Sequence, residues 1–295
     1  MTYHLLRLLL NAVGLLPLRV LYLLSGPVYL LVYHIAGYRK KVVRRNLSES
    51  FPEKSPAELR RIEKEFYHFF ADMLLESCKM SSMSAEEMKS RMKFVNVEAV
   101  NEVLRSGKSV ALFLGHYGNW EWISSMPLSL DRSAVAAQIY HKLRNEAMDR
   151  LMLEHRASHG AVNVDMYRTA RYINELAQQG KVSIIGFIAD QSPKKREVRH
   201  FLHFLNHDTP VLTGTEKIAK HYGFEPWFVS VRRVRRGCYE AEFVKMHDDA
   251  RSLPDFELTA IYYRMLEEMI RRRPELYLWT HNRFKHARRE GNAQN

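Results

Sequence analysis

Residues 110–122 have the sequence VALFLGHYGNWEW, and this stretch decides the fold class. Five apolar residues, Val110–Leu114, predict a buried strand, and the two glycines that follow allow the chain to turn. Asn119 is a good N-cap for a helix that we expect to begin at Trp120. A buried strand, a loop and a helix in this order form the repeating unit of α/β proteins.

The same alternation continues along the chain. Apolar runs predict further strands at 135–140, 161–164, 182–189, 227–231 and 239–243, and helical spacing occurs at 55–80, 144–158, 168–179, 213–222 and 256–273. This pattern predicts an α/β sandwich with a central, largely parallel sheet flanked by helices. We expect one domain over 39–288 and a polar tail at 289–295, because no repeat or Gly/Ser linker divides the chain.

Residues 1–38 form a separate apolar segment. Positions 20–38 contain no Lys, Arg, Asp or Glu, and a basic cluster follows at Arg39, Lys40, Lys41, Arg44 and Arg45. Such a cluster beside an apolar segment is attracted to an anionic membrane surface and marks its cytoplasmic side. We therefore expect residues 1–38 to attach the protein to a membrane, by a short span or an interfacial helix. A pair of buried core helices is the alternative.

The composition excludes several classes of protein. Hydrophobic residues make up 46% and charged residues 26% of the chain, which excludes disorder and low-complexity scaffolds. A mean hydropathy of −0.35 excludes a polytopic membrane protein. The net charge of +12 indicates an anionic partner, such as nucleic acid, an anionic membrane or a phosphorylated ligand. The two cysteines, Cys78 and Cys238, lie far apart in sequence, as suits a reducing compartment.

The densest chemical cluster is the loop after the first of these strands, with His116 and Glu121 five positions apart. On a continuous helix they would lie about 140° apart, so they can meet only if the chain turns. An ionised carboxylate that contacts a histidine fixes its tautomer and stabilises the imidazolium. We expect His116 to be a general base and Glu121 its orienting carboxylate. The alternative is a structural turn in which His116 satisfies a buried hydrogen bond.

The chain contains no obvious protein nucleophile, since it has no G-x-S-x-G sequence and no motif around either cysteine. A general base at His116 would therefore activate a hydroxyl group of a bound substrate. That hydroxyl would then attack an acyl carbonyl.

Five segments, in order, carry a resemblance to a known family. They are Arg44-Arg45-Asn46-Leu47 with Phe51-Pro52, the His116-x-x-x-x-Glu121 loop, Ile188-Ala189-Asp190-Gln191-Ser192-Pro193, Thr213-Gly214-Thr215, and the stretch from Pro274 to Lys285. The second resembles the H-x4-D/E motif of the glycerolipid acyltransferase superfamily. Together the five resemble the lipid A biosynthesis acyltransferases, and they cover most of the chain.

The resemblance implies a single-domain acyltransferase at the cytoplasmic face of the inner membrane. It would transfer a fatty acyl chain from an acyl carrier protein thioester to a hydroxyl of a lipid A precursor, without a metal or organic cofactor. The implied partners are acyl carrier protein, the lipid and an anionic membrane surface, and no nucleic acid. Two alternatives stay open: another lipid acceptor, such as an aminolipid or glycolipid, and a catalytically inactive binding protein.

Further residues are candidates for binding substrate. Asp190 and Gln191 follow a predicted strand at the edge where the site should lie, so they could contact substrate or the His116 loop. Asn119 lies within that loop. Arg168 and Arg171 could bind a phosphate or an oxyanion, and a solvated helix face is the alternative for both.

A cluster of histidines and a cluster of arginines could have other functions. His200, His203 and His207 have helical spacing, but the ligand set is incomplete, so we expect no metal site and instead a loop at an acyl channel or membrane. Arg232, Arg233, Arg235 and Arg236 predict a charged hairpin turn. We expect this turn to be solvated, with contact to acyl carrier protein or lipid phosphates as the alternative.

Overall fold

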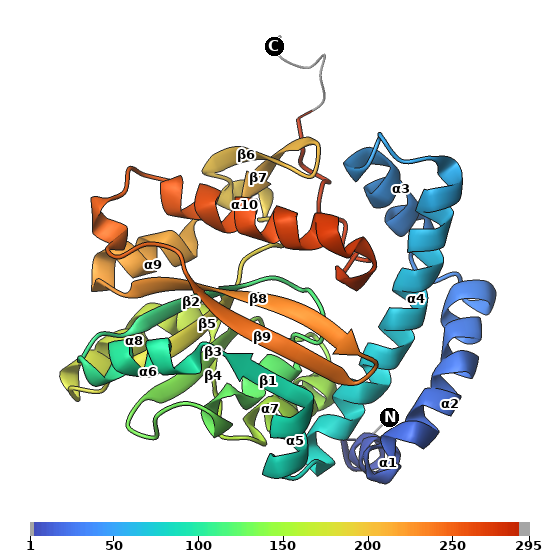
Figure 1. Ribbon diagram of the computed structural model, residues 1–295, viewed down its shortest axis with the longest axis horizontal. Helices are drawn as coiled ribbons and strands as arrows, with labels where there is room; N and C mark the ends of the chain where they lie inside the picture. The colour runs from blue at the N-terminus through green and yellow to red at the C-terminus, as the bar shows by residue number, and fades with distance from the viewer. Residues whose placement is uncertain (1–2, 289–295) are drawn as a thin grey trace.

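The computed structural model describes residues 3–288, and a seven-stranded sheet lies at its centre (Figure 1). The strand order is β1-β9-β8-β2-β5-β3-β4, and all neighbours are parallel except β8 and β9. The strands are β1 (Met92–Val95), β2 (Val110–Leu114), β3 (Val135–Tyr140), β4 (Val162–Asp165), β5 (Ser183–Ile188), β8 (Glu225–Arg235) and β9 (Cys238–Lys245). The predicted α/β class, with a mainly parallel sheet flanked by helices, is confirmed.

The central strands are continuous apolar runs because helices cover both faces of the sheet. All five residues of β2 are buried, and β5 is buried from Ser183 to Phe187. The sequence predicted β2 and β3 with their observed bounds, whereas β8 is longer than expected and β1 was missed. Strand β1 is only four residues long and two of them are exposed, so it lacks the apolar run that marks the others.

The helices that complete the domain are α3 (Lys40–Ser50), α4 (Pro56–Lys79), α5 (Ala85–Arg91), α6 (Val97–Arg105), α7 (Glu146–Ala157), α8 (Thr169–Gln178), α9 (Gly214–Tyr222) and α10 (Glu257–Arg272). Helix α4 begins at a capping box, in which Ser55 and Glu58 satisfy each other's backbone N–H groups. Figure 1 shows α4 between the sheet and the N-terminal helices. It therefore connects the N-terminal segment to the rest of the domain.

The N-terminal segment folds as α1 (Tyr3–Leu15) and α2 (Leu18–Tyr29), which continues as a π-helix over Leu30–Ile35. Both helices pack on α4. One flank of α2 and its extension is buried, at Leu21, Ser25, Tyr29 and Tyr33. The other flank exposes large apolar side chains at Val20, Leu23, Leu24, Leu30, Leu31 and Ile35. Within residues 3–288, Leu18–Ile35 is the one helix long and apolar enough to cross a membrane.

The basic cluster after this helix is largely engaged within the protein. Arg39 donates to the backbone carbonyl of Thr280, Arg44 pairs with Glu63, and Arg45 donates to the Asn282 side chain. The buried Asn46 amide donates to two further carbonyls of the C-terminal segment, at Trp279 and His281. The basic passage is thus also a structural connection between α3 and residues 279–282.

The two clusters of basic residues were predicted only in part. The segment of His200, His203 and His207, expected to be a loop, is an antiparallel hairpin of β6 (His200–Phe204) and β7 (His207–Val211). His207 stacks on Phe284. The arginine turn between β8 and β9 is not fully solvated, because Arg233 and Arg236 both pair with Asp72 of α4. A carboxylate 161 positions away could not be assigned to this turn from local sequence.

Candidate active site

Strand register brings His116 and Asp190 together. In the parallel pair β2–β5, Leu114 lies opposite Ile188, and each strand then continues for two residues to one of the two side chains. Helix α10 fixes both strand ends, since Tyr262 donates to the carbonyl of Leu114 and Tyr263 donates to that of Ala189. The pair therefore lies at the carboxyl edge of the sheet, where open α/β sheets bind their ligands.

His116 and Asp190 form a close hydrogen-bonded pair. The Nδ1 atom of His116 lies 2.6 Å from Oδ1 of Asp190, and the His116 backbone N–H donates to Oδ2 at 3.1 Å. Burial by itself raises the pKa of Asp190, but the charge and hydrogen bonds of His116 outweigh it and lower that pKa below its usual value. An ionised Asp190 accepts a hydrogen bond from the N–H group at Nδ1, so the imidazole presents Nε2 as its basic atom.

The loop after β2 depends on two glycines. A Cβ atom at Gly115 would lie 2.5 Å from Leu266, and Gly118 has φ +60 with Val231 against it. The positive φ favours glycine at position 118, and a side chain at position 115 would force Leu266 to move. Tight packing here fixes the path of the chain from His116 to the short 3-10 helix Trp122–Leu128, which replaces the helix predicted from Trp120.

The expectation that Glu121 orients His116 was wrong in its choice of carboxylate. Arg156 of α7 donates to both oxygens of Glu121, at 2.7 Å each, and Trp120 Nε1 donates at 3.2 Å. Burial raises the pKa of Glu121, but the bonds and charge of Arg156 lower it below its usual value. Glu121 turns toward α7, whereas Asp190 reaches His116 because their strands are neighbours. The local spacing could not reveal either partner.

A cavity of about 410 Å³ begins at His116 and extends over one face of the sheet. Alternate residues of neighbouring strands form its floor: Leu112 and Leu114, Gly186 and Ile188, and Gln138 and Tyr140. Ile123 and Met126 close it from the side, and the Glu121–Arg156 pair lies on its wall. The cavity thus combines an apolar interior with a few fixed polar groups near His116.

The other predicted binding residues lie in different positions. Gln191 lines the cavity, and its side-chain nitrogen is 3.2 Å from His116 Nε2. Asn119 is fully buried and lies outside the cavity lining, with its side chain bound to Glu76 and to the Trp122 backbone N–H. Arg168 and Arg171 are exposed and do not line the cavity, and Arg171 pairs with Glu175 along its own helix. The expected contact between Asp190 and the His116 loop is present.

Sequence reasoning missed several residues around the site. Arg156 had no local signal, because one arginine on an amphipathic helix resembles any solvated cation. His281 and Arg283 belonged to a recognised segment but were not assigned to the site. His281 Nε2 accepts from the Ser192 backbone N–H beside Gln191, and burial lowers the pKa of His281 to about 4. Arg283 is fully buried, and its bonds go to Thr209 and Tyr263.

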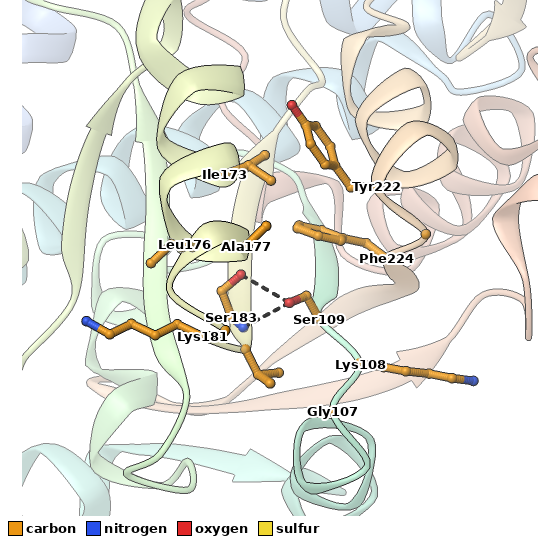
Figure 2. Close-up of a pocket in the computed structure, with 13 residues that line it drawn as sticks. Gly107, Lys108, Ser109, Ile173, Leu176, Ala177, Lys181, Ser183, Tyr222 and Phe224 are labelled. Carbon is orange, nitrogen blue, oxygen red and sulfur yellow. Dashed lines mark hydrogen bonds between the residues drawn. The ribbon is translucent and has the colours of Figure 1, made fainter.

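A second hollow, of about 320 Å³, lies at the opposite, amino edge of the same central strands (Figure 2). Ser109 and Ser183 hydrogen-bond at its base, and Lys108 and Lys181 point away from each other at its rim. Among the residues that the structure describes, its lining holds no histidine and no carboxylate. This hollow therefore offers no histidine–carboxylate pair, and the carboxyl edge is the candidate active site.

Fold and site together define an α/β enzyme with a histidine–carboxylate pair at the head of an apolar cavity, as suits a transferase of long-chain groups. A family model of bacterial lipid A biosynthesis acyltransferases matches residues 1–286, so the chain belongs to this family. It is therefore an acyltransferase. A comparison with curated protein sequences finds no match.

Proposed function

We propose that the protein transfers a fatty acyl chain from an acyl carrier protein thioester to a hydroxyl group of a lipid A precursor, with His116 as the general base and Asp190 as its orienting carboxylate. The observation that carries this proposal is the 2.6 Å contact between His116 Nδ1 and Asp190 at the head of the apolar cavity. Membership of the lipid A acyltransferase family supports acyl transfer to lipid A.

In this mechanism the acceptor hydroxyl gives its proton to His116 Nε2 as its oxygen attacks the thioester carbonyl. The new C–O bond forms first, and the C–S bond then breaks to leave the ester and a thiolate. His116 returns the proton to the thiolate, so the carrier leaves as a free thiol. Asp190 stabilises the imidazolium between these two transfers, and a base so positioned contributes about 10²–10⁴-fold to the rate.

Arg156 is our candidate for stabilising the oxyanion. Only its Nε and one Nη group bind Glu121, so further N–H groups of the guanidinium remain for a ligand in the cavity. A fixed cation close to the position where negative charge develops lowers the barrier to acyl transfer. The apolar floor formed by β2, β5 and β3 would hold the acyl chain, because its burial is favourable and needs no polar partner.

We propose attachment to the cytoplasmic face of the inner membrane through the outer flank of α2. The support is that Leu23, Leu30 and Ile35 are among the side chains exposed on this flank, while the opposite flank packs on α4. A helix bound to its own domain along one side is suited to lie in the interface, with its apolar flank in the lipid, more than to cross the bilayer alone.

The test is acyl transfer by the purified protein in detergent, with a mixture of acyl carrier protein thioesters and a tetra-acylated lipid A precursor. Mass spectrometry should show the gain of one acyl chain, and the His116→Ala variant should abolish it while remaining folded. Near wild-type transfer by His116→Ala would contradict the general base. If the precursor gains no chain but a lipid in a total extract does, the acceptor is an aminolipid or glycolipid instead.

A further inference from the structure

One carboxylate outside the cavity connects the loop of residues 115–121, called the catalytic loop because it carries His116, to the N-terminal helices. Glu76 of α4 is fully buried, yet its side chain accepts hydrogen bonds from three different parts of the chain. Asn119 donates to Oε2 at 2.8 Å, Tyr239 donates to the same oxygen at 2.7 Å, and Tyr22 donates to Oε1 at 2.9 Å. These donors belong to the His116 loop, to β9 and to α2.

The catalytic loop is attached to Glu76 at two points. In addition to the Asn119 bond, the indole N–H of Trp122 donates to the Glu76 backbone carbonyl at 3.1 Å. Asn119 in turn accepts from the Trp122 backbone N–H through its other side-chain atom, at 3.2 Å. The span from His116 to Glu121 therefore bends around an amide that Glu76 holds. A shift of this amide would move both His116 and Glu121.

Tyr22, which binds Glu76 from α2, is itself held in place by several contacts. Its hydroxyl lies against Gly237 in the β8–β9 turn, where a Cβ atom would come within 2.0 Å, and the Arg236 guanidinium lies 4.3 Å from its ring centre. Arg236 also binds Ser25 of α2 and Asp72 of α4. Helix α2 is thus bound by polar contacts to the same cluster that holds the catalytic loop.

A buried carboxylate is a costly way to fill a core position. Burial raises the pKa of Glu76 above its usual value, although the hydrogen bonds from Tyr239 and Asn119 act to lower it. Replacement of a buried charged group by an apolar side chain of similar size is often neutral or stabilising. What an apolar residue could not supply is a fixed acceptor for Asn119 and Tyr22 together. The main contribution of Glu76 is therefore to fix the position of the catalytic loop, and its contribution to the free energy of unfolding is smaller.

We infer that Glu76 is a positioning residue for acyl transfer, and that through Tyr22 it makes helix α2 part of the catalytic scaffold. The inference rests on the proposed function, since it concerns the placement of His116. The N-terminal segment would then do more than attach the protein to a membrane. Loss of its bond to Glu76 would slow the reaction even when both substrates are supplied in detergent solution.

The first test is kinetic and uses acyl carrier protein thioester with the tetra-acylated lipid A precursor. Glu76→Gln keeps the shape but places an amide N–H against its donors, so kcat should fall about 10- to 100-fold while KM changes less than twofold. Glu76→Gln combined with Asn119→Asp exchanges amide and carboxylate and should recover most of the loss. A residue that only stabilised the fold would lower the melting temperature and leave kcat per folded molecule unchanged. Unchanged kcat in Glu76→Gln, or no recovery in the double variant, would overturn the inference.

Tyr22→Phe provides a milder variant if Glu76→Gln does not fold. It removes one hydrogen bond between α2 and Glu76 without contact to the cavity, and kcat should fall several-fold with KM unchanged. Tyr29→Phe is the matched control, because it makes the same change on the buried flank of the same helix away from this cluster. Equal effects of the two substitutions would count against a role for Tyr22.

Hydrogen exchange gives a measurement that does not depend on the substrates. In Glu76→Gln and Tyr22→Phe the backbone amides of residues 115–124 should exchange faster than in wild type, and in Tyr29→Phe they should not. Unchanged protection would overturn the inference whatever the activity. If instead His116→Ala stays active, the proposed function fails. The exchange result would still show whether Glu76 fixes residues 115–124.

Discussion

The two ends of the central strands carry hollows of similar size but different chemistry. At the carboxyl edge, a cavity of about 410 Å³ begins at the His116–Asp190 pair. At the amino edge, a hollow of about 320 Å³ is formed by helix ends, two hydrogen-bonded serines and two exposed lysines. Volume therefore does not distinguish the site, and the fixed, buried ionisable groups do.

The difference follows from how the chain leaves a parallel strand. At the carboxyl edge, β2 and β5 end side by side, so the two loops that follow place His116 and Asp190 in contact. Helix α7 adds Arg156 from a third segment. At the amino edge the chain enters the strands directly from helix ends, as at Gly180. Within residues 3–288, no loop there carries a paired ionisable side chain toward the hollow. Predictions about single residues test this contrast.

The largest effect is expected at Asp190. Asp190→Asn keeps the size of the side chain but removes the charge and can donate to Nδ1, which favours the wrong imidazole tautomer for catalysis. We expect kcat to fall about 10²–10⁴-fold with a preserved fold, measured by single-turnover acyl transfer and circular dichroism. Activity within threefold of wild type would show that the His116–Asp190 contact is not used.

A smaller loss is expected at Glu121. Glu121→Gln leaves the cation of Arg156 with a neutral partner, so the guanidinium loses its fixed position on the cavity wall. We expect about a tenfold decrease in kcat/KM, clearly less than for Asp190→Asn, in the same assay. A larger loss of activity in Glu121→Gln than in Asp190→Asn would indicate that Glu121 orients His116, and would contradict the observed geometry.

The carboxyl edge should also make stability depend on pH through His281. Burial lowers the pKa of His281 from 6.5 to about 4, so the unfolded chain binds this proton more readily than the folded one. The free energy of unfolding should therefore decrease as the pH falls from about 6.5 toward 4. His281→Gln should flatten this decrease, as measured by urea unfolding between pH 5 and 7.5. Parallel curves for the two proteins would contradict it.

The smallest effect is expected at the amino edge. Lys108→Ala combined with Lys181→Ala removes two exposed cations from the rim of the second hollow. Because surface charges without close partners contribute little to stability, we expect activity and melting temperature within error of wild type. A large loss of acyl transfer would show that this edge takes part in function and would break the contrast between the two hollows.

Much of the architecture could be predicted from the sequence because the central strands are continuous apolar runs. The bounds of β2 and β3 followed from such runs, and α4 followed from Ser55 and Pro56 at its start. Strand β1 could not be predicted in this way, since only half of its four residues face the core. His200, His203 and His207 were expected in a loop, because their spacing does not show the antiparallel pairing of β6 with β7.

The site was predictable in part. His116 could be predicted because it follows a buried strand and lies between two glycines. Asp190 could be predicted because it follows another strand of the same sheet. Its pairing with His116 depended on the neighbour relation of β2 and β5, which no local pattern contains. Glu121 was assigned to His116 because the glycines allow the chain to turn between them and because the pair resembles the H-x4-D/E motif. Asn119 was assigned to substrate, and only packing on α4 revealed its bond to Glu76.

The sequence by itself determined the α/β class, the apolar N-terminal segment with its basic flank, and the loop that carries the histidine, because each depends on composition or periodicity within a few residues. Tertiary structure alone decided which carboxylate contacts His116, which cation holds Glu121, and how α2 joins the catalytic loop through Glu76. Those partners lie between 35 and 74 positions apart in sequence. Strand order and helix packing bring them together, and neither is encoded in any single stretch of the chain.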